Sequence, residues 1–116
     1  QEMVTAVEER LPVKVAIVNN QHLGMVRQWQ QHFYDNRKSA VDLHVQPDFV
    51  KLAEAFGALG LRATRVEEVE PVLEQAFAHP GPVMIDFRVA EVENCYPMVP
   101  SGAPSAKMIL HDPGID

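Results

Sequence analysis

A short run of mostly apolar residues at positions 13–18 (VKVAIV) constrains the fold of this chain more than any other feature. Four of its six residues are β-branched, and such runs fit a strand that is buried on both faces of a parallel sheet. The preceding residues 2–10 follow a helical period, and Pro12 prevents that helix from continuing into the run. We therefore expect a helix, then a buried strand, at the start of an α/β fold.

The rest of the chain repeats this alternation of helix and strand. Asp48 is a suitable N-cap, Gly57 a suitable helix end, and Val69 to Phe77 repeat with the strongest helical period. The predicted elements are a helix at 25–34, a loop at 35–47, a helix at 49–56, a strand within 59–66, a helix at 69–77, a strand at 83–89, a tail from 90 and a last helical turn near 107–110. Helices between strands imply right-handed crossovers, so we predict an α/β fold with a parallel sheet and helices on both faces.

Length and charge narrow the class of protein. The chain has 116 residues, which fits one domain, and its formal net charge is -6 with no block of cations. Nucleic acids and anionic membranes both require clustered cations, so neither is an expected partner. No apolar run reaches the length of about 18 residues that a membrane-spanning helix needs. The single cysteine, Cys95, suits a reducing compartment such as the cytoplasm.

The polar turn at residues 19–24 (NNQHLG) follows the first predicted strand and is the first place to look for chemistry. Open α/β sheets bind ligands outside the carboxyl ends of their strands. The turn begins with two asparagines, Asn19 and Asn20, and an amide oxygen suits Mg²⁺, although Asn-rich turns are common because Asn tolerates left-handed backbone. Gly24 permits close approach, and a helix starting at Met25 directs its positive end toward this turn, where an anion could bind.

Other side chains give weaker signals. Met25, Trp29 and His32 share one helix face, which is more typical of a core than of a pocket, and the imidazole of His22 is expected to be exposed in a loop. The histidines show no metal-ligand spacing, and nucleophile-elbow, Walker and dinucleotide-binding motifs do not occur. Asp86 has no evident carboxylate partner for acid–base work, and Cys95 has no neighbouring base.

Two motifs, NNQHLGMVRQW at 19–29 and YPMVPSGA at 96–103, resemble the C-terminal cofactor-binding domain of acetolactate synthase catalytic subunits. The similarity extends over LPVKVAIVNNQHLGMVRQWQQHFYDNR, PDFVKLAEAFGALGLRA, GPVMIDFRV and ENCYPMVPSGA, and so covers nearly the whole chain. Other thiamine-diphosphate enzymes share the two asparagines but not the rest of these motifs.

This resemblance implies a thiamine-diphosphate site that is completed by Mg²⁺. Asn20 matches the amide ligand of the metal, and His22 matches the position whose main-chain carbonyl is a second ligand. Leu23, Gly24 and Met25 match residues beside the diphosphate and the reacting centre. The substrate channel, which also binds sulfonylurea and imidazolinone herbicides in this family, is matched by Met25, Val26, Trp29 and Ser101.

The resemblance also implies that parts of the site lie outside this chain. A Gly-Asp-Gly motif with the acidic metal ligand would fall before Gln1, and the activating glutamate and the FAD-binding domain would lie further away. We therefore expect residues 1–116 to be a C-terminal portion of a thiamine-diphosphate-binding domain, with a tail at 90–116 and a missing first strand. By itself this portion has no expected catalytic residue, and it should be inactive.

The expected parent enzyme decarboxylates pyruvate and joins the two-carbon unit to pyruvate or 2-ketobutyrate, in the biosynthesis of branched-chain amino acids. It would be a homodimer or homotetramer, with a regulatory small subunit as a further partner, in the cytoplasm or in a plastid. Two alternatives stay open. One is another thiamine-diphosphate enzyme, such as glyoxylate carboligase or pyruvate oxidase, and the other is a non-catalytic flavodoxin-like binding module.

Overall fold

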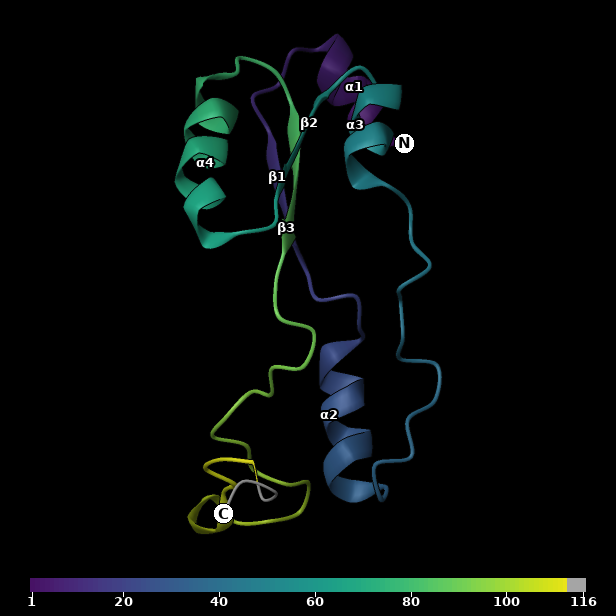
Figure 1. Cartoon of the computed structure of the whole chain (residues 1–116), viewed down its shortest axis with the longest axis vertical. Helices are drawn as coiled ribbons and strands as arrows, with labels where there is room; N and C mark the ends of the chain where they lie inside the picture. Colours follow the sequence, from purple (N-terminus) through teal and green to yellow (C-terminus); the bar gives the residue numbers. More distant parts are fainter. Residues whose placement is uncertain (113–116) are drawn as a thin grey trace. The chain divides into compact units, whose positions relative to one another are not determined.

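The computed structural model describes residues 1–112, which form two compact units (Figure 1). The first, called the sheet unit here, consists of Gln1–Gln21 and Leu43–Ala90. The second, called the helix–tail unit, consists of His22–Asp42 and the described residues from Glu91 onward. No helix in the described part of the chain is both long and apolar enough to cross a bilayer.

The sheet unit is built on three parallel strands in the order β1-β3-β2. They are β1 (Lys14–Asn19), β2 (Leu59–Ala63) and β3 (Val83–Arg88). In their register Ala16 of β1 and Leu61 of β2 both lie opposite Ile85 of β3. This confirms the predicted parallel sheet, with each strand within a few residues of its expected limits. The expected burial of the run at 13–18 on both faces is wrong, because β1 is an edge strand of the described sheet and Val18 is 71% exposed.

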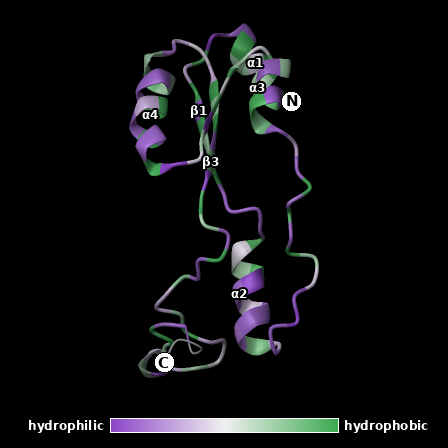
Figure 2. Cartoon of the chain, viewed as in Figure 1, coloured by the Kyte–Doolittle hydropathy of each residue, from purple (hydrophilic) through white to green (hydrophobic). Residues whose placement is uncertain are grey.

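Helices cover both faces of this sheet, as predicted. Figure 1 shows α1 (Glu2–Glu8) and α3 (Phe49–Ala55) on one face and α4 (Val69–Ala78) on the other. The core on the α4 side consists of the buried Ala76, Val83 and Ile85, with Leu59, Leu61, Val72, Leu73 and Phe87 packed around them. Figure 2 shows hydrophilic and hydrophobic residues on different sides of α4, as its helical period requires.

Local chemistry explains where α3 begins and ends. The Asp48 side chain accepts hydrogen bonds from the Val50 and Lys51 N–H groups at 3.1 and 3.4 Å, which confirms the predicted N-cap. Gly57 follows the helix with φ +81°, a conformation that side chains disfavour. Gly60 on β2 lets α3 approach closely, because a Cβ there would lie 2.5 Å from the Val50 carbonyl oxygen.

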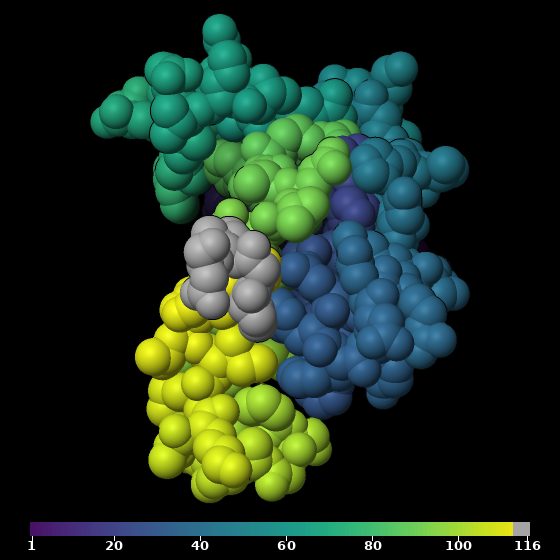
Figure 3. Space-filling model, turned by 60° about the horizontal axis from the view of Figure 1, so that its bottom comes forward, coloured from purple at the N-terminus to yellow at the C-terminus, as the bar shows by residue number. Residues whose placement is uncertain are grey.

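The helix–tail unit contains α2 (Gly24–Phe33), the loop that follows it and the C-terminal tail. In the tail, Met98 and Ile109 form an isolated antiparallel bridge. The helical turn predicted near 107–110 is instead a 3₁₀ turn, η2 (Ser105–Lys107), because Ile109 pairs its backbone with Met98 and so cannot be helical. Figure 3 shows the tail gathered beside the segment that contains α2.

Candidate functional site

The carboxyl end of β1 turns sharply immediately after the strand. Asn19 is the last strand residue and is only 6% exposed, whereas Asn20 is half-buried. The left-handed residue of this turn is Gln21, with φ +57°, and not an asparagine as the sequence suggested. The Asn19 side-chain oxygen explains this conformation, since it accepts a hydrogen bond from the Gln21 N–H at 3.1 Å.

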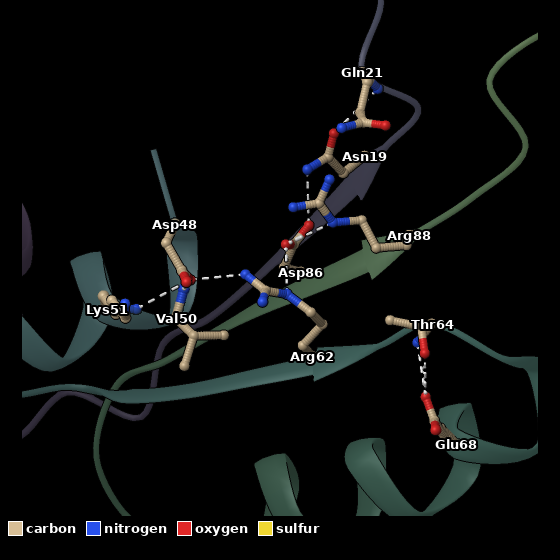
Figure 4. A network of polar contacts seen from close by, with 10 residues as sticks. All are labelled: Asn19, Gln21, Asp48, Val50, Lys51, Arg62, Thr64, Glu68, Asp86 and Arg88. Carbon is tan, nitrogen blue, oxygen red and sulfur yellow. Dashed lines mark hydrogen bonds and ion pairs between the residues drawn. The ribbon is translucent and has the colours of Figure 1, made fainter. Parts of the chain in front are cut away.

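A fully buried carboxylate, Asp86 on β3, organises this end of the sheet (Figure 4). Its Oδ1 accepts from Nδ2 of Asn19 at 2.9 Å. Its Oδ2 accepts from Nε of Arg62 on β2 and from Nε of Arg88, each at 3.0 Å. A buried charge is tolerated only when it is paired and hydrogen-bonded, and two guanidinium groups with one amide fulfil that condition here.

The sequence pattern did not indicate this cluster, because the partners of Asp86 are two arginines and an amide and not a second carboxylate. The partners lie 67 positions away at Asn19 and 24 positions away at Arg62, on the two strands that flank β3. One signal could have found it. Asp86 follows the apolar residues 83–85 in the central strand, and a carboxylate at such a position requires partners on the neighbouring strands.

The hydrogen bonds of the Asp86 cluster give Asn19 a different role from that of Asn20. Both ends of the Asn19 amide are engaged within the protein, by Asp86 and by the Gln21 N–H, so Asn19 has a structural role. Asn20 offers a neutral amide oxygen at the carboxyl end of β1, and that chemistry fits Mg²⁺. No group of three or more His, Cys, Asp or Glu side chains in residues 1–112 could hold a metal ion.

The helix–tail unit places the other predicted cofactor residues around the start of α2. His22 forms an isolated antiparallel bridge with Asp42, and the Leu23 N–H donates to the Val41 carbonyl oxygen at 2.9 Å. The helix begins at Gly24 with no side-chain cap on its first N–H groups and no acidic residue in its first turn. Uncapped N–H groups at a positive helix end suit an anion such as a diphosphate.

One face of α2 borders a cavity of about 580 Å³. Three predicted channel residues line it together with three residues further along the chain, the six being Met25, Val26, Trp29, Gln30, Tyr34 and Arg37. The Trp29 ring packs against Phe33, whose ring centroid lies 5.5 Å away in an edge-to-face arrangement. The lining is mostly apolar with one cation, which can accommodate a small acyl group beside a carboxylate. Ser101, the fourth predicted channel residue, is exposed and does not line this cavity.

The opposite side of α2 is held by the tail through polar contacts. Gln28 is 1% exposed; its Nε2 donates to the Cys95 carbonyl at 2.9 Å, and its Oε1 accepts from the Cys95 N–H at 2.8 Å. Arg27, also 1% exposed, donates to the side chain of Asn94. His32 contacts the Tyr96 hydroxyl at 2.8 Å. Cys95 therefore acts through its main chain, in a pairing that its sequence neighbours did not indicate.

Comparison with known proteins agrees with this geometry. Residues 1–87 match the family described as thiamine pyrophosphate enzyme, C-terminal TPP binding domain. The acetolactate synthase large subunit of Parasynechococcus marenigrum is 51% identical over 110 residues, covering 94% of this chain and 18% of that protein. The isozyme 2 large subunit of Escherichia coli is 42% identical over 109 residues, covering 94% of this chain and 20% of that protein.

A solved structure points to the same family. The thiamine diphosphate-dependent 4-hydroxybenzoylformate decarboxylase of Rhodococcus jostii RHA1 superposes with a TM-score of 0.70 at 26% identity, over 79% of this chain and 17% of that one. The chain thus spans about a fifth of the length of the proteins it matches. The similarity to acetolactate synthase large subunits that the two motifs indicated is confirmed, and the chain belongs to the family of C-terminal TPP-binding domains of thiamine pyrophosphate enzymes.

Proposed function

We propose that this chain supplies part of the thiamine-diphosphate site of an acetolactate synthase large subunit. The observation that carries the proposal is the turn after β1, which presents Asn20 at the carboxyl end of the strand while Asn19 is fixed by Asp86. The identity of 42% to 51% with named acetolactate synthase large subunits supports this reaction over others in the family. The parent would join two molecules of pyruvate, or pyruvate and 2-ketobutyrate, into a 2-acetohydroxy acid with release of one CO₂ from the donor pyruvate.

In this proposal each group of the chain has a defined task. The Asn20 side-chain oxygen and the His22 main-chain carbonyl are ligands of Mg²⁺, which binds the diphosphate. Leu23, Gly24 and Met25 lie at the start of α2, whose uncapped N–H groups favour the anionic diphosphate. Bound thiamine diphosphate supplies the nucleophilic carbon and the electron sink that decarboxylation of a 2-keto acid requires.

The cavity beside α2 is the proposed channel for the keto acids. Met25, Val26 and Trp29 give it an apolar wall, and the flat indole limits the size of the acceptor. Arg37, whose guanidinium also pairs with Asp35 at 3.5 Å, places a cation at the same cavity for a 2-keto acid carboxylate. Ser101 is proposed to act on this channel from the tail.

The remaining components of the proposal concern the whole parent protein. FAD binds outside this chain, the assembly is a homodimer or homotetramer, and a regulatory subunit is a further partner. The free thiol of Cys95 supports a reducing compartment, either the cytoplasm or a plastid.

The test uses the full-length protein that contains this chain. It should form acetolactate from pyruvate only when thiamine diphosphate and Mg²⁺ are both present. Asn20→Ala removes an oxygen ligand, and it should raise the Mg²⁺ concentration for half-maximal activity by about tenfold or more, the equivalent of about 1.4 kcal/mol. Asn20→Asp keeps an oxygen and should have a smaller effect, and Gln75→Ala on the exposed side of α4 is the matched control.

Products other than acetolactate would assign the parent protein to another reaction. Carboligation of glyoxylate in preference to pyruvate would assign the parent to glyoxylate carboligase chemistry, and oxygen-dependent consumption of pyruvate would assign it to pyruvate oxidase chemistry. A protein that neither binds thiamine diphosphate nor turns over a 2-keto acid would be a non-catalytic module, and the proposal would be wrong.

A further inference from the structure

The Asp86 cluster carries an inference that goes beyond cofactor binding as such. The two oxygens of Asp86 have separate partners. Oδ1 accepts from the Asn19 amide, and Oδ2 accepts from the two guanidinium groups of Arg62 and Arg88. Figure 4 shows these groups converging on the carboxylate from all three strands. An ionised carboxylate accepts at both oxygens, whereas an amide in its place would accept at one end and donate at the other.

The orientation of the Asn19 amide determines a hydrogen bond within the turn. With Nδ2 directed at Asp86, its Oδ1 is directed at the Gln21 N–H, 3.1 Å away. That hydrogen bond holds Gln21 at φ +57°, a conformation that a residue with a side chain adopts only when its surroundings enforce it. Asn20 lies between the strand residue and the left-handed residue, so its orientation follows from both.

We propose that Asp86 is a positioning residue for Asn20. It selects the orientation of the Asn19 amide, this amide fixes the backbone of the turn at Gln21, and the turn directs the Asn20 side chain toward the metal. The inference rests on the proposed function, because it assigns a task to the ligand that the proposal places at Asn20. It predicts that affinity for thiamine diphosphate requires the hydrogen-bond donors and acceptors at positions 19 and 86 to be complementary to each other.

Exchanging the two side chains gives a direct test. In Asp86→Asn, the amide oxygen satisfies the guanidinium groups of Arg62 and Arg88, and the amide nitrogen then faces the Nδ2 of Asn19. Asn19 must flip, so its nitrogen faces the Gln21 N–H and the turn loses its hydrogen bond. In Asn19→Asp, two carboxylates face each other. Each single variant should weaken binding of thiamine diphosphate at least tenfold, measured by calorimetric titration of the full-length apoprotein at saturating Mg²⁺.

The double variant Asn19→Asp with Asp86→Asn restores every hydrogen bond. The amide oxygen now at position 86 accepts from both arginines, and the amide nitrogen there donates to the carboxylate now at position 19. The other oxygen of that carboxylate accepts from the Gln21 N–H. The affinity of the double variant should return to within about threefold of the wild-type value. A general structural role for Asp86 would not give this reciprocal rescue, because two independent defects would add.

Asp48→Asn is the matched control. It weakens the other contact of Arg62, which donates to Asp48 at 2.7 Å, without reaching Asn19. It should leave cofactor affinity unchanged even where the melting temperature of the apoprotein falls. Should Asp86→Asn not fold, Asn19→Ala serves instead, since it keeps Asp86 with both arginines and removes the two hydrogen bonds of the Asn19 side chain, one to Asp86 and one to the Gln21 N–H. It should also weaken binding at least tenfold.

Three results would overturn the inference. The first is that Asp86→Asn or Asn19→Ala binds thiamine diphosphate as tightly as the wild type. The second is that the double variant binds it as weakly as the single variants do. The third is that Asp48→Asn loses as much affinity as Asp86→Asn. Failure of the proposed function looks different, because the wild-type protein would then bind no thiamine diphosphate at all.

Discussion

The sheet unit and the helix–tail unit are stabilised in different ways. The sheet unit buries apolar side chains, with Val83 and Ile85 of β3 at no more than 1% exposure. In the helix–tail unit the most deeply buried side chains are polar, namely Arg27 and Gln28, each 1% exposed. Apolar burial is non-directional and depends on area, whereas the polar contacts of α2 depend on the partner groups of the tail being in place. We therefore expect the apolar core of the sheet unit to be sensitive to loss of side-chain volume, whereas the contacts between α2 and the tail, like the Asp86 cluster of the sheet unit, are sensitive to loss of a hydrogen-bonding partner.

The largest expected effect is in the sheet unit, at Ile85. Replacing it by Ala leaves a cavity in the centre of β3 and should cost about 2–5 kcal/mol of local stability. Hydrogen exchange of the full-length protein should show this as faster exchange in peptides covering 83–88, with little change in those covering 24–33. Val45→Ala, at a fully exposed position, is the control. Equal acceleration in both peptides would mean that the two units open together.

A smaller effect is expected at Gln28 in the helix–tail unit. Gln28→Ala leaves the Cys95 N–H and carbonyl without the side chain that pairs with both, which should cost about 1–3 kcal/mol. Exchange should accelerate in peptides covering 94–98 while β3 keeps its wild-type protection. Gln30→Ala on the same helix removes only exposed contacts with Ser39 and serves as the control. If both variants behaved alike, the buried pairing would not hold the tail.

The smallest expected effect is the response of the sheet unit to acid at Glu68. Hydrogen bonds from the Thr64 backbone N–H, the Arg65 side chain and the Thr64 hydroxyl lower the pKa of Glu68 from 4.5 to about 2. A depressed pKa means that the ionised group stabilises the fold above pH 4.5 and that this contribution is lost as the pH falls toward 2.

Comparing variants isolates that contribution. Glu68→Gln should flatten the dependence of the melting temperature on pH between about 4.5 and 2, because Gln cannot ionise. Glu67→Gln, one residue earlier in the same turn, should keep the wild-type dependence. Identical pH profiles for the wild type and Glu68→Gln would contradict the assignment, and hydrogen exchange would show whether the loss is confined to the start of α4.

Much of the fold could be predicted from the sequence, because its signals are local. The apolar run at 13–18 predicted β1 to within one residue, and the helical period at 69–77 predicted α4. Asp48 and Gly57 marked the two ends of α3, since capping and left-handed backbone are decided by the residues at those positions. The motifs at 19–29 and 96–103 indicated the family, and the roles assigned through them to Asn20, His22 and Ser101 stay predictions.

What only the tertiary structure decided depends on groups that are distant in the sequence. The carboxylate of Asp86 is buried because β1 and β2 bring Asn19 and Arg62 to it across 67 and 24 positions. The pairing of Gln28 with Cys95 also spans 67 positions. A polar side chain is buried when its partners compensate the lost hydration, and the sequence alone does not show which partners the fold supplies. The adjacent asparagines look equivalent in the sequence, and the cluster around Asp86 is what gives Asn19 its structural role.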